Sequence, residues 1–304
     1  MTILITGING FIGSSLANHF CGEGYNVIGL GRTEKLGSHV NSACKYMRID
    51  ITKPMENIAC DYVVHAAANT NDMAGYDDHY LVNFIGTRHV IQSTKEAKGF
   101  IFISSSSVYN FRKEIAYAET DDSKGVQFIS DYGKSKLLAE QEVRQECKQP
   151  FLILRPRAVY GPGDTVVLPR IAKLIKRNKL LLPSHITKKT SLTHIYNLIA
   201  VISKAVKEHK IENRIFNIAD LKTYSLQEAI THLLRVQNEI NPKIVFIPSL
   251  LWELMVSLNH YLGFNKNISR FGSRQMTSEA VLNIETASEY FRGCFNAHLY
   301  LENN

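Results

Sequence analysis

Short apolar runs alternate with longer amphipathic segments through the first half of the chain. Runs rich in Val, Ile and Phe are typical of buried strands, whereas apolar residues spaced three and four apart indicate helices. The pattern predicts strands at residues 2–6, 26–30, 46–49, 62–65, 100–104 and 151–154, and helices at residues 11–21, about 81–97 and 130–147. Because apolar strands separated by helices favour a parallel sheet covered on both faces, we expect an α/β fold with a Rossmann-type doubly wound parallel sheet.

The alternation weakens after Pro156. Here the pattern predicts helices at about residues 167–177, 192–208, 225–238 and 250–262, and a strand at residues 215–218. We interpret this part as a smaller α+β lobe over the carboxyl ends of the strands. The 304 residues suffice for two domains. The expected division is a dinucleotide-binding domain at residues 1–160 and a substrate-binding lobe at residues 161–304, with a soft boundary that the chain can cross back over.

The composition is that of a globular protein, because 45% of the residues are hydrophobic and 21% are charged. No apolar run approaches the roughly 20 residues of a membrane-spanning helix, and the first residues read as a strand rather than an export signal. These features predict a cytoplasmic protein without a membrane partner. Five widely spaced cysteines without a CxxC pair indicate reduced thiols, and neither a metal site nor a redox dithiol.

The net charge of +7 leaves three classes of partner open: nucleic acid, a membrane surface and an anionic small molecule. The basic residues are scattered in modest local groups, without a long basic tract or an aromatic RNA-binding signature. A solvated basic surface is the simplest interpretation. A diphosphate-bearing ligand ranks next, and nucleic acid is not expected as a partner.

A glycine-rich turn joins the first predicted strand to the first helix. Gly7 permits a tight turn, Gly10 lets a pyrophosphate approach the backbone, and Gly13 lets the helix pack closely on the strand. Free N–H groups at the start of a helix also attract phosphate. The turn therefore predicts a nicotinamide dinucleotide site, with Phe11 and Ile12 at the start of the helix as further contacts.

The ends of the second and third predicted strands bear on the choice of cofactor. Proteins that bind NAD usually place an acid at the end of the second strand, but Arg32 follows this one. A guanidinium there suits a 2′-phosphate and favours NADP over NAD, although a surface arginine is the alternative. Asp50 is placed to accept from an adenine amino group, with Ile51 beside it. A capping or turn role for Asp50 is the competing interpretation.

Tyr132 and Lys136 are four residues apart at the start of a predicted helix, so both side chains share one face. A phenol with an ordinary pKa near 10 is a poor base at neutral pH, but a neighbouring ammonium favours the phenolate. Tyr132 could then move a proton to or from an oxygen while a hydride moves at carbon, and Lys136 would also hold the cofactor ribose. A chance surface pair is the alternative.

Four serines follow the fifth strand, at residues 104–107. Ligands bind at the carboxyl ends of strands in open α/β sheets, and a hydroxyl there can stabilise charge on a reacting oxygen. With these motifs in order, the chain resembles the extended short-chain dehydrogenases/reductases, the NAD-dependent epimerase/dehydratase family that acts mainly on nucleotide sugars. The resemblance is carried by residues 6–13, 65–68, 83–87, 104–109, 132–136, 154–164, 191–198 and 216–225.

The resemblance implies roles for individual residues. Ser105 matches the catalytic hydroxyl, and Tyr132 and Lys136 match the proton-transfer pair. The implied cofactor contacts also include Ala66 and Ala67 on the adenosine side, Asn83 near the floor of the site, and Pro156 close to the nicotinamide. Family members are often dimers, which makes a homodimer one option.

Departures from the family pattern narrow the reaction. Ser106 and Ser107 stand where dehydratases have two acids, which disfavours 4,6-dehydration, and both are candidate substrate contacts. Ala158 stands where many hexose epimerases and decarboxylases have Asn, and Asn110 replaces a usual Gly. Arg170 in the basic lobe is a candidate contact for a diphosphate.

The expected function is NAD(P)-dependent oxidoreduction at C4 of a nucleotide-diphosphate sugar, in polysaccharide precursor synthesis. Arg32 and Ala158 favour reduction of a 4-keto group. The alternatives are a 4-epimerase that retains NAD, and a reductase or dehydrogenase of a non-sugar carbonyl or sterol-like substrate. A non-catalytic dinucleotide sensor ranks last because Tyr132 and Lys136 are both present.

Overall fold

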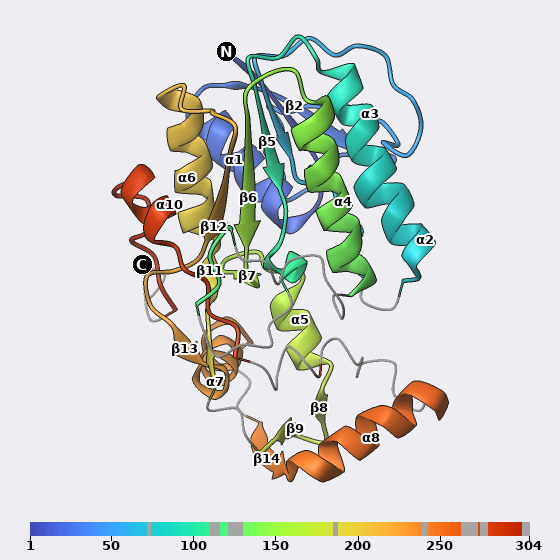
Figure 1. Cartoon of the computed structure of the whole chain (residues 1–304), viewed down its shortest axis with the longest axis vertical. Coiled ribbons are helices and arrows are strands. Elements are labelled where there is room, and N and C mark those ends of the chain that lie inside the picture. Colours follow the sequence, from blue (N-terminus) through green and yellow to red (C-terminus); the bar gives the residue numbers. More distant parts are fainter. Residues whose placement is uncertain are drawn as a thin grey trace.

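A computed structural model describes residues 1–71, 74–109, 116–120, 130–184, 188–238, 242–262, 273 and 279–299. Its centre is a seven-stranded parallel sheet in the order β3-β2-β1-β4-β5-β6-β12 (Figure 1). The strands are β1 (Thr2–Thr6), β2 (Asn26–Gly31), β3 (Lys45–Arg48), β4 (Tyr62–His65), β5 (Gly99–Ile103), β6 (Phe151–Pro156) and β12 (Arg214–Ile218). The order reverses between β1 and β4, so the predicted Rossmann-type fold is confirmed.

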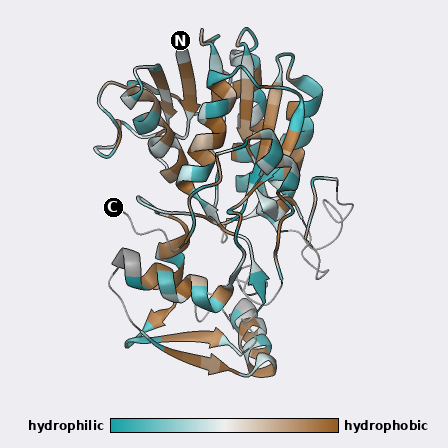
Figure 2. Cartoon of the chain, turned by 90° about the vertical axis from the view of Figure 1, so that its left-hand side faces the viewer, coloured by the Kyte–Doolittle hydropathy of each residue, from teal (hydrophilic) through white to brown (hydrophobic). Residues whose placement is uncertain are grey.

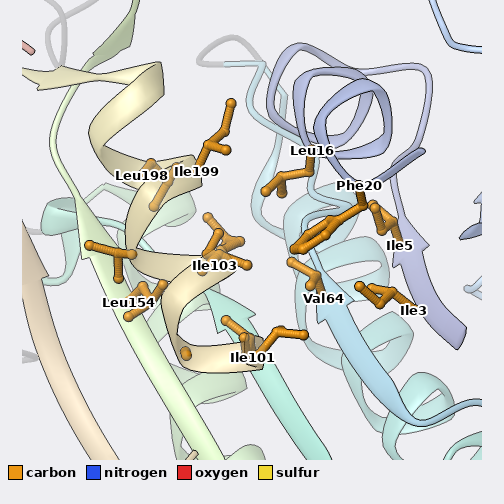
Figure 3. Close-up of a cluster of buried hydrophobic side chains, with 14 of the residues drawn as sticks. Ile3, Ile5, Leu16, Phe20, Val64, Ile101, Ile103, Leu154, Leu198 and Ile199 are labelled. Carbon is orange, nitrogen blue, oxygen red and sulfur yellow. The ribbon is translucent and has the colours of Figure 1, made fainter. Parts of the chain in front are cut away.

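Helices cover both faces of this sheet (Figure 1). On one face lie α1 (Phe11–Gly22), α6 (Ile195–Lys207) and α10 (Glu285–Tyr290); on the other lie α2 (Tyr76–His79), α3 (Gly86–Ser93) and α4 (Asp131–Glu146). Side chains alternate along each strand, so Ile3 and Ile5 pack against Leu16 and Phe20 of α1 (Figure 3). Leu4 points to the other face and packs in the cluster formed with residues of α3 and α4. The inner strands β1, β4 and β5 are largely hydrophobic because both of their faces are buried (Figure 2). The edge strand β3 is more polar, and its Lys45 and Arg48 are exposed.

The helix predicted at residues 81–97 begins earlier and contains an irregular turn. Between α2 and α3, residues Tyr80–Ile85 form a π-helix, η1, and the run ends at Ser93. A π-helix is wider than an α-helix and is common at functional sites. Here it contains Asn83, whose side chain is fully buried. Sequence periodicity does not register such a turn, because it changes the phase of the helix by a single residue.

Beyond the carboxyl ends of the central strands lies the smaller lobe (Figure 1). It includes β7 (Val159–Tyr160), α5 (Val167–Ala172), β8 (Ile175–Lys176), β9 (Lys179–Pro183), β10 (Lys189–Thr190), β13 (Tyr224–Ser225), α7 (Leu226–Asn238), β14 (Lys243–Ile247) and α8 (Ser249–Leu262). After residue 160 the chain returns twice to the central sheet. First α6 covers one face and β12 pairs with β6, and after α8 the chain returns again and places α10 on the same face as α6.

Two helix predictions after residue 160 are corrected. The helix expected at residues 167–177 ends at Ala172, because a hairpin formed by β8 and β9 follows. Its turn residues Arg177 and Asn178 have φ values of 48° and 58°, the left-handed conformation that tight hairpins require. The helix expected at residues 192–208 begins at Ile195, because β11 (Thr193–His194) pairs with β7 just before it.

Strands β9 and β14 were not expected, and they pair in parallel as part of a three-stranded sheet. Within the ranges described, no helix combines the length and the apolar character needed to cross a membrane. Nor does this part of the chain gather three His, Cys, Asp or Glu side chains into a metal site.

Candidate active site

A cleft of about 710 Å³ lies where the central strands meet the smaller lobe. One wall comes from the turn after β1, the segment after β4, the serines after β5 and the start of α4, and the other comes from α5 and α7. Of the residues predicted from the sequence, the cleft is lined by Gly7, Gly10, Phe11, Ile12, Gly13, Ala66, Ser105, Ser106, Ser107, Tyr132, Lys136, Pro156 and Arg170. The fold therefore gathers most of the predicted site in one cavity.

The turn after β1 leaves no room for side chains at two glycines. Gly7 has a φ of 68°, and a Cβ on it would lie 2.8 Å from the Cα of Ala67. A Cβ on Gly13 would lie 2.2 Å from the carbonyl oxygen of Gly7. Helix α1 begins at Phe11, and its first N–H groups have no partner inside the helix. This backbone fits the diphosphate of a dinucleotide, which needs a close approach and N–H donors.

The segment after β4 is held by a chain of buried hydroxyls. The Thr87 hydroxyl donates to the Asn83 carbonyl at 2.6 Å, so it must accept from Nε2 of His65 at 2.9 Å. Nδ1 of His65 then accepts from the Thr6 hydroxyl at 2.6 Å, which in turn accepts from the backbone N–H of Ala67. Burial, followed by the Lys136 charge, lowers the pKa of His65 to about 3, so the ring is neutral. His65 is a structural residue here.

The four serines after β5 have different surroundings. Ser104 is buried and its hydroxyl donates to Oε1 of Glu140 at 2.5 Å. Ser105 caps a short 3₁₀ turn (Ser106–Val108): its Oγ accepts from the Ser107 N–H at 3.1 Å and donates to the Ser107 hydroxyl at 3.1 Å. These contacts orient Ser105 at the carboxyl end of β5, where its hydroxyl can hydrogen-bond to a reacting oxygen.

Tyr132 lies in the first turn of α4, which Ser130 caps by accepting from the Gly133 N–H at 3.0 Å. The Ser135 hydroxyl donates to the Tyr132 carbonyl at 2.7 Å. The Tyr132 ring meets the buried ring of His79 edge to face, with centroids 5.8 Å apart. Backbone and ring contacts thus hold the phenol toward the cleft.

Lys136 lies one turn further along α4 and is only 1% exposed. Its Nζ lies 4.1 Å from the centroid of the Phe102 ring, a distance at which the ring face attracts a cation. Burial lowers the pKa of Lys136 to about 7, and the charge of Glu140 opposes that shift. The Lys136 side chain therefore changes between ammonium and neutral amine near neutral pH.

A buried ion pair lies behind this lysine. Arg155 donates from Nε and Nη2 to the two carboxylate oxygens of Glu140, at 2.8 and 2.5 Å, and both side chains are at most 2% exposed. Arg155 also donates to the Tyr109 hydroxyl at 2.8 Å. Sequence reasoning missed this pair, although an arginine within an apolar strand and a glutamate one turn beyond Lys136 were visible signals.

Asn83, expected near the floor of the site, does not line the cleft. Its Oδ1 accepts from the Asn69 N–H at 2.7 Å, and its Nδ2 donates to the Asn69 carbonyl at 3.2 Å and to the Ser135 hydroxyl at 2.9 Å. Because Ser135 in turn bonds to Tyr132, the amide of Asn83 ties the wall after β4 to the first turn of α4. It acts as a brace behind the site.

The remaining predicted cofactor contacts lie outside the cleft. Arg32 is exposed just after β2. Asp50 accepts from the N–H and hydroxyl of Thr52, and these hydrogen bonds lower its pKa, so a turn role accounts for its contacts here. Ile51 is buried against Gly86 of α3, and Ala67 contributes its backbone to the His65 network. None of these four lines the cavity, although Ala67 packs directly against Gly7, which does.

The lobe supplies a wall that is part cationic and part apolar. The Arg170 guanidinium donates across the cleft to the Thr70 carbonyl, and Lys173 lies on the same wall. Sequence reasoning did not single out the apolar lining residues, which are Val166, Val167, Ile171, Leu174, Leu226 and Ile230. They are ordinary helix-face residues in the sequence, and only the placement of α5 and α7 turns them toward a ligand.

Residues 3–219 match the model of the NAD dependent epimerase/dehydratase family. The 2-alkyl-3-oxoalkanoate reductase of Stenotrophomonas maltophilia (strain K279a) is 27% identical over 212 residues, which are 65% of this chain and 62% of that protein. Less than two-thirds of that relative is therefore matched.

Two solved structures have the same fold. MoeE5 in complex with UDP-glucuronic acid and NAD gives a TM-score of 0.75 at 19% identity, over 98% of this chain and 95% of that chain. The UDP-glucuronic acid 4-epimerase from Bacillus cereus in complex with NAD gives a TM-score of 0.73 at 22% identity, with the same coverage of 98% and 95%.

Proposed function

The chain belongs to the NAD-dependent epimerase/dehydratase family, whose enzymes use a nicotinamide dinucleotide as cofactor. On this basis we propose that it reduces the 4-keto group of a nucleotide-diphosphate sugar. Such a step would serve the synthesis of polysaccharide precursors. The observation that carries the proposal is that Ser105, Tyr132 and Lys136 line one cleft with the cations Arg170 and Lys173. The first three residues suit proton transfer at a carbonyl oxygen, and the two cations suit a diphosphate.

The chemistry follows from the surroundings of each group. Gly7, Gly10 and the start of α1 would hold the cofactor diphosphate, and the nicotinamide, when bound, supplies a hydride to the carbonyl carbon. The Ser105 hydroxyl donates to the carbonyl oxygen and stabilises the charge that develops there. Tyr132 gives its proton to the same oxygen, and the Lys136 ammonium stabilises the phenolate that remains.

Two features of the chain support reduction over the family's other reactions. Dehydration needs an acidic and a basic side chain beside the sugar, but the two positions after Ser105 carry serine hydroxyls. The nearby carboxylate of Glu140 cannot replace them, because both of its oxygens accept hydrogen bonds from Arg155. Arg32 carries a positive charge at the end of β2, where an adenosine 2′-phosphate would be recognised, which supports NADPH as the reductant.

The test starts with the protein purified without added nucleotide. We expect denaturation to release no stoichiometric NAD, and NADPH to bind more tightly than NADH. NADPH should then be oxidised when a nucleotide-diphosphate 4-keto-6-deoxy sugar is added. Retained NAD, with interconversion of two 4-epimers and no net oxidation, would favour the epimerase instead. Failure to bind either nucleotide would contradict both.

A second candidate is reduction of a non-sugar carbonyl that carries an alkyl or sterol-like group. The observation that favours it is an apolar wall, formed by Ile171 of α5 and Leu174 just after it, together with Leu226 and Ile230 of α7. The named activity of the Stenotrophomonas relative, reduction of a 2-alkyl-3-oxoalkanoate, has the same character. NADPH oxidation with a long-chain 3-oxo acid, and none with the 4-keto sugar, would establish this candidate over the first.

A further inference from the structure

The three-stranded sheet at the far end of the lobe carries a row of cations. In the register of the strands, Lys176 of β8 pairs with Lys179 of β9, and Lys179 pairs with Lys243 of β14. Paired residues point to the same side of a sheet, so three ammonium groups stand next to one another. Arg177, in the turn between β8 and β9, extends the row. All four residues are exposed.

Like charges placed opposite each other destabilise a sheet, so such a row needs a reason. Of the carboxylates that the structure describes, none forms an ion pair with Lys176, Lys179 or Lys243. The repulsion among these three lysines is therefore not offset by any carboxylate that the structure describes. An anionic partner would offset it.

The same face of the sheet becomes apolar away from the lysines. Side chains alternate along a strand, so Leu181 follows Lys179 and Val245 follows Lys243 on that face. Both are only partly buried, whereas Leu180, on the opposite face, is completely buried in the core of the lobe. A cationic edge thus continues into an apolar surface.

Helix α8 follows β14 directly and lies beside the three-stranded sheet, at the end of the molecule farthest from the N-terminus (Figure 1). Leu250, Leu254 and Leu258 repeat every four residues and are 80%, 56% and 48% exposed. Trp252 and Val256 form the buried side of the helix. A line of leucines held in water while another side of the helix packs inward is unusual for a surface that has no partner.

We propose that this end of the lobe binds peripherally to an anionic phospholipid surface. Exposed leucines on an amphipathic helix enter the boundary between headgroups and acyl chains, and nearby lysines bind the anionic headgroups. A second copy of the chain fits less well, because a symmetric contact through this face would bring two cationic rows together. The proposal replaces the sequence-based expectation of no membrane partner, since peripheral binding needs no spanning helix, and it does not depend on the substrate.

The test is co-sedimentation of the full chain with vesicles of phosphatidylcholine, with and without about 30% phosphatidylglycerol. We expect binding to the anionic vesicles, little binding to the neutral ones, and loss of binding in high salt. The triple variant Lys176→Glu, Lys179→Glu, Lys243→Glu should weaken binding by about 100-fold or more. The matched control changes three exposed lysines of the Rossmann half, Lys53, Lys95 and Lys148, to Glu and should retain most of the binding.

The leucines need a separate pair of variants. Leu254→Asn with Leu258→Asn should weaken vesicle binding by about tenfold or more, whereas Leu221→Asn, at an exposed leucine in the loop after β12, should not. Unchanged NADPH binding and thermal unfolding would show that each variant is folded. Equal affinity for neutral and anionic vesicles, no binding to either, or self-association that the leucine variants abolish would overturn the proposal.

Discussion

The Nζ of Lys136 lies 4.1 Å from the centroid of the Phe102 ring, so a helix residue of the proposed active site rests on the face of a strand residue. The ring attracts the ammonium but replaces only part of the water that burial removes. The pKa of Lys136 is therefore lowered to about 7, even though Glu140 lies one helical turn away and acts in the opposite direction. The charge of the proposed active site therefore depends on whether Lys136 is protonated.

The first prediction concerns pH. The Lys136 ammonium stabilises the Tyr132 phenolate and is lost as pH rises through about 7, so we expect kcat/KM for reduction to fall as pH rises through that value. His65 contributes nothing to this decline, because its pKa of about 3 keeps it neutral throughout. The measurement is kcat/KM between about pH 5 and 9. A value that stays level, or rises, across neutral pH would contradict this assignment.

A second prediction isolates the proton donor. Tyr132→Phe removes the phenolic proton but keeps the ring that packs on His79, so kcat should fall by about 10²- to 10⁴-fold while nucleotide affinity is retained. Steady-state rates and a fluorescence titration with NADPH measure the two quantities. The control is Tyr196→Phe, at an exposed tyrosine of α6, which should leave both unchanged. Full activity of Tyr132→Phe would remove this residue from the mechanism.

The ion pair of Glu140 and Arg155 should dominate stability near the site. Glu140→Gln leaves the buried Arg155 charge without its carboxylate, and we expect unfolding free energy to fall by about 3–5 kcal/mol. Urea denaturation measures this loss. Lys98→Ala breaks an exposed ion pair with Asp61 and should leave the urea midpoint unchanged within error. Equal effects of the two substitutions would show that burial does not strengthen the first pair.

The glycine turn permits a steric test within one helix. In Gly13→Ala the new Cβ would lie 2.2 Å from the Gly7 carbonyl oxygen, and no side-chain rotation relieves a clash with backbone, so the turn must shift. We expect NADPH affinity to fall by about tenfold or more, because the N–H groups that face the phosphates move with the turn. Gly22→Ala, at the end of the same helix, meets no heavy atom within 4 Å and should bind normally.

Cofactor choice is tested at the end of β2. Arg32→Glu replaces a cation that suits the 2′-phosphate with an acid that suits a free 2′-hydroxyl. The preference for NADPH over NADH should therefore drop by about 10- to 100-fold, measured as the ratio of the two kcat/KM values. Arg144→Glu, at an exposed position in the last turn of α4, changes the net charge equally and should leave the ratio unchanged. If Arg32→Glu leaves the ratio of the two kcat/KM values unchanged, Arg32 does not contact the cofactor and is a solvated surface residue.

Local patterns in the sequence were enough to predict the architecture of the Rossmann half. The apolar run at Thr2–Thr6 and the glycines after it specify a strand and a tight turn through side-chain alternation and backbone sterics, which act within a few residues. The spacing of Tyr132 and Lys136 likewise places both on one face of a helix before any tertiary contact is known. Most residues predicted for the site from these patterns line the cleft.

Other features depend on contacts between distant parts of the chain, and only the tertiary structure decided them. The hairpin of β8 and β9 interrupts an amphipathic pattern that suits a helix equally well, and β14, some 60 residues later, completes its sheet. The lowered pKa of Lys136 depends on burial against Phe102, which no neighbouring residue reveals. Periodicity and backbone sterics are local and can be read from the sequence, whereas burial and strand pairing depend on how the whole chain folds.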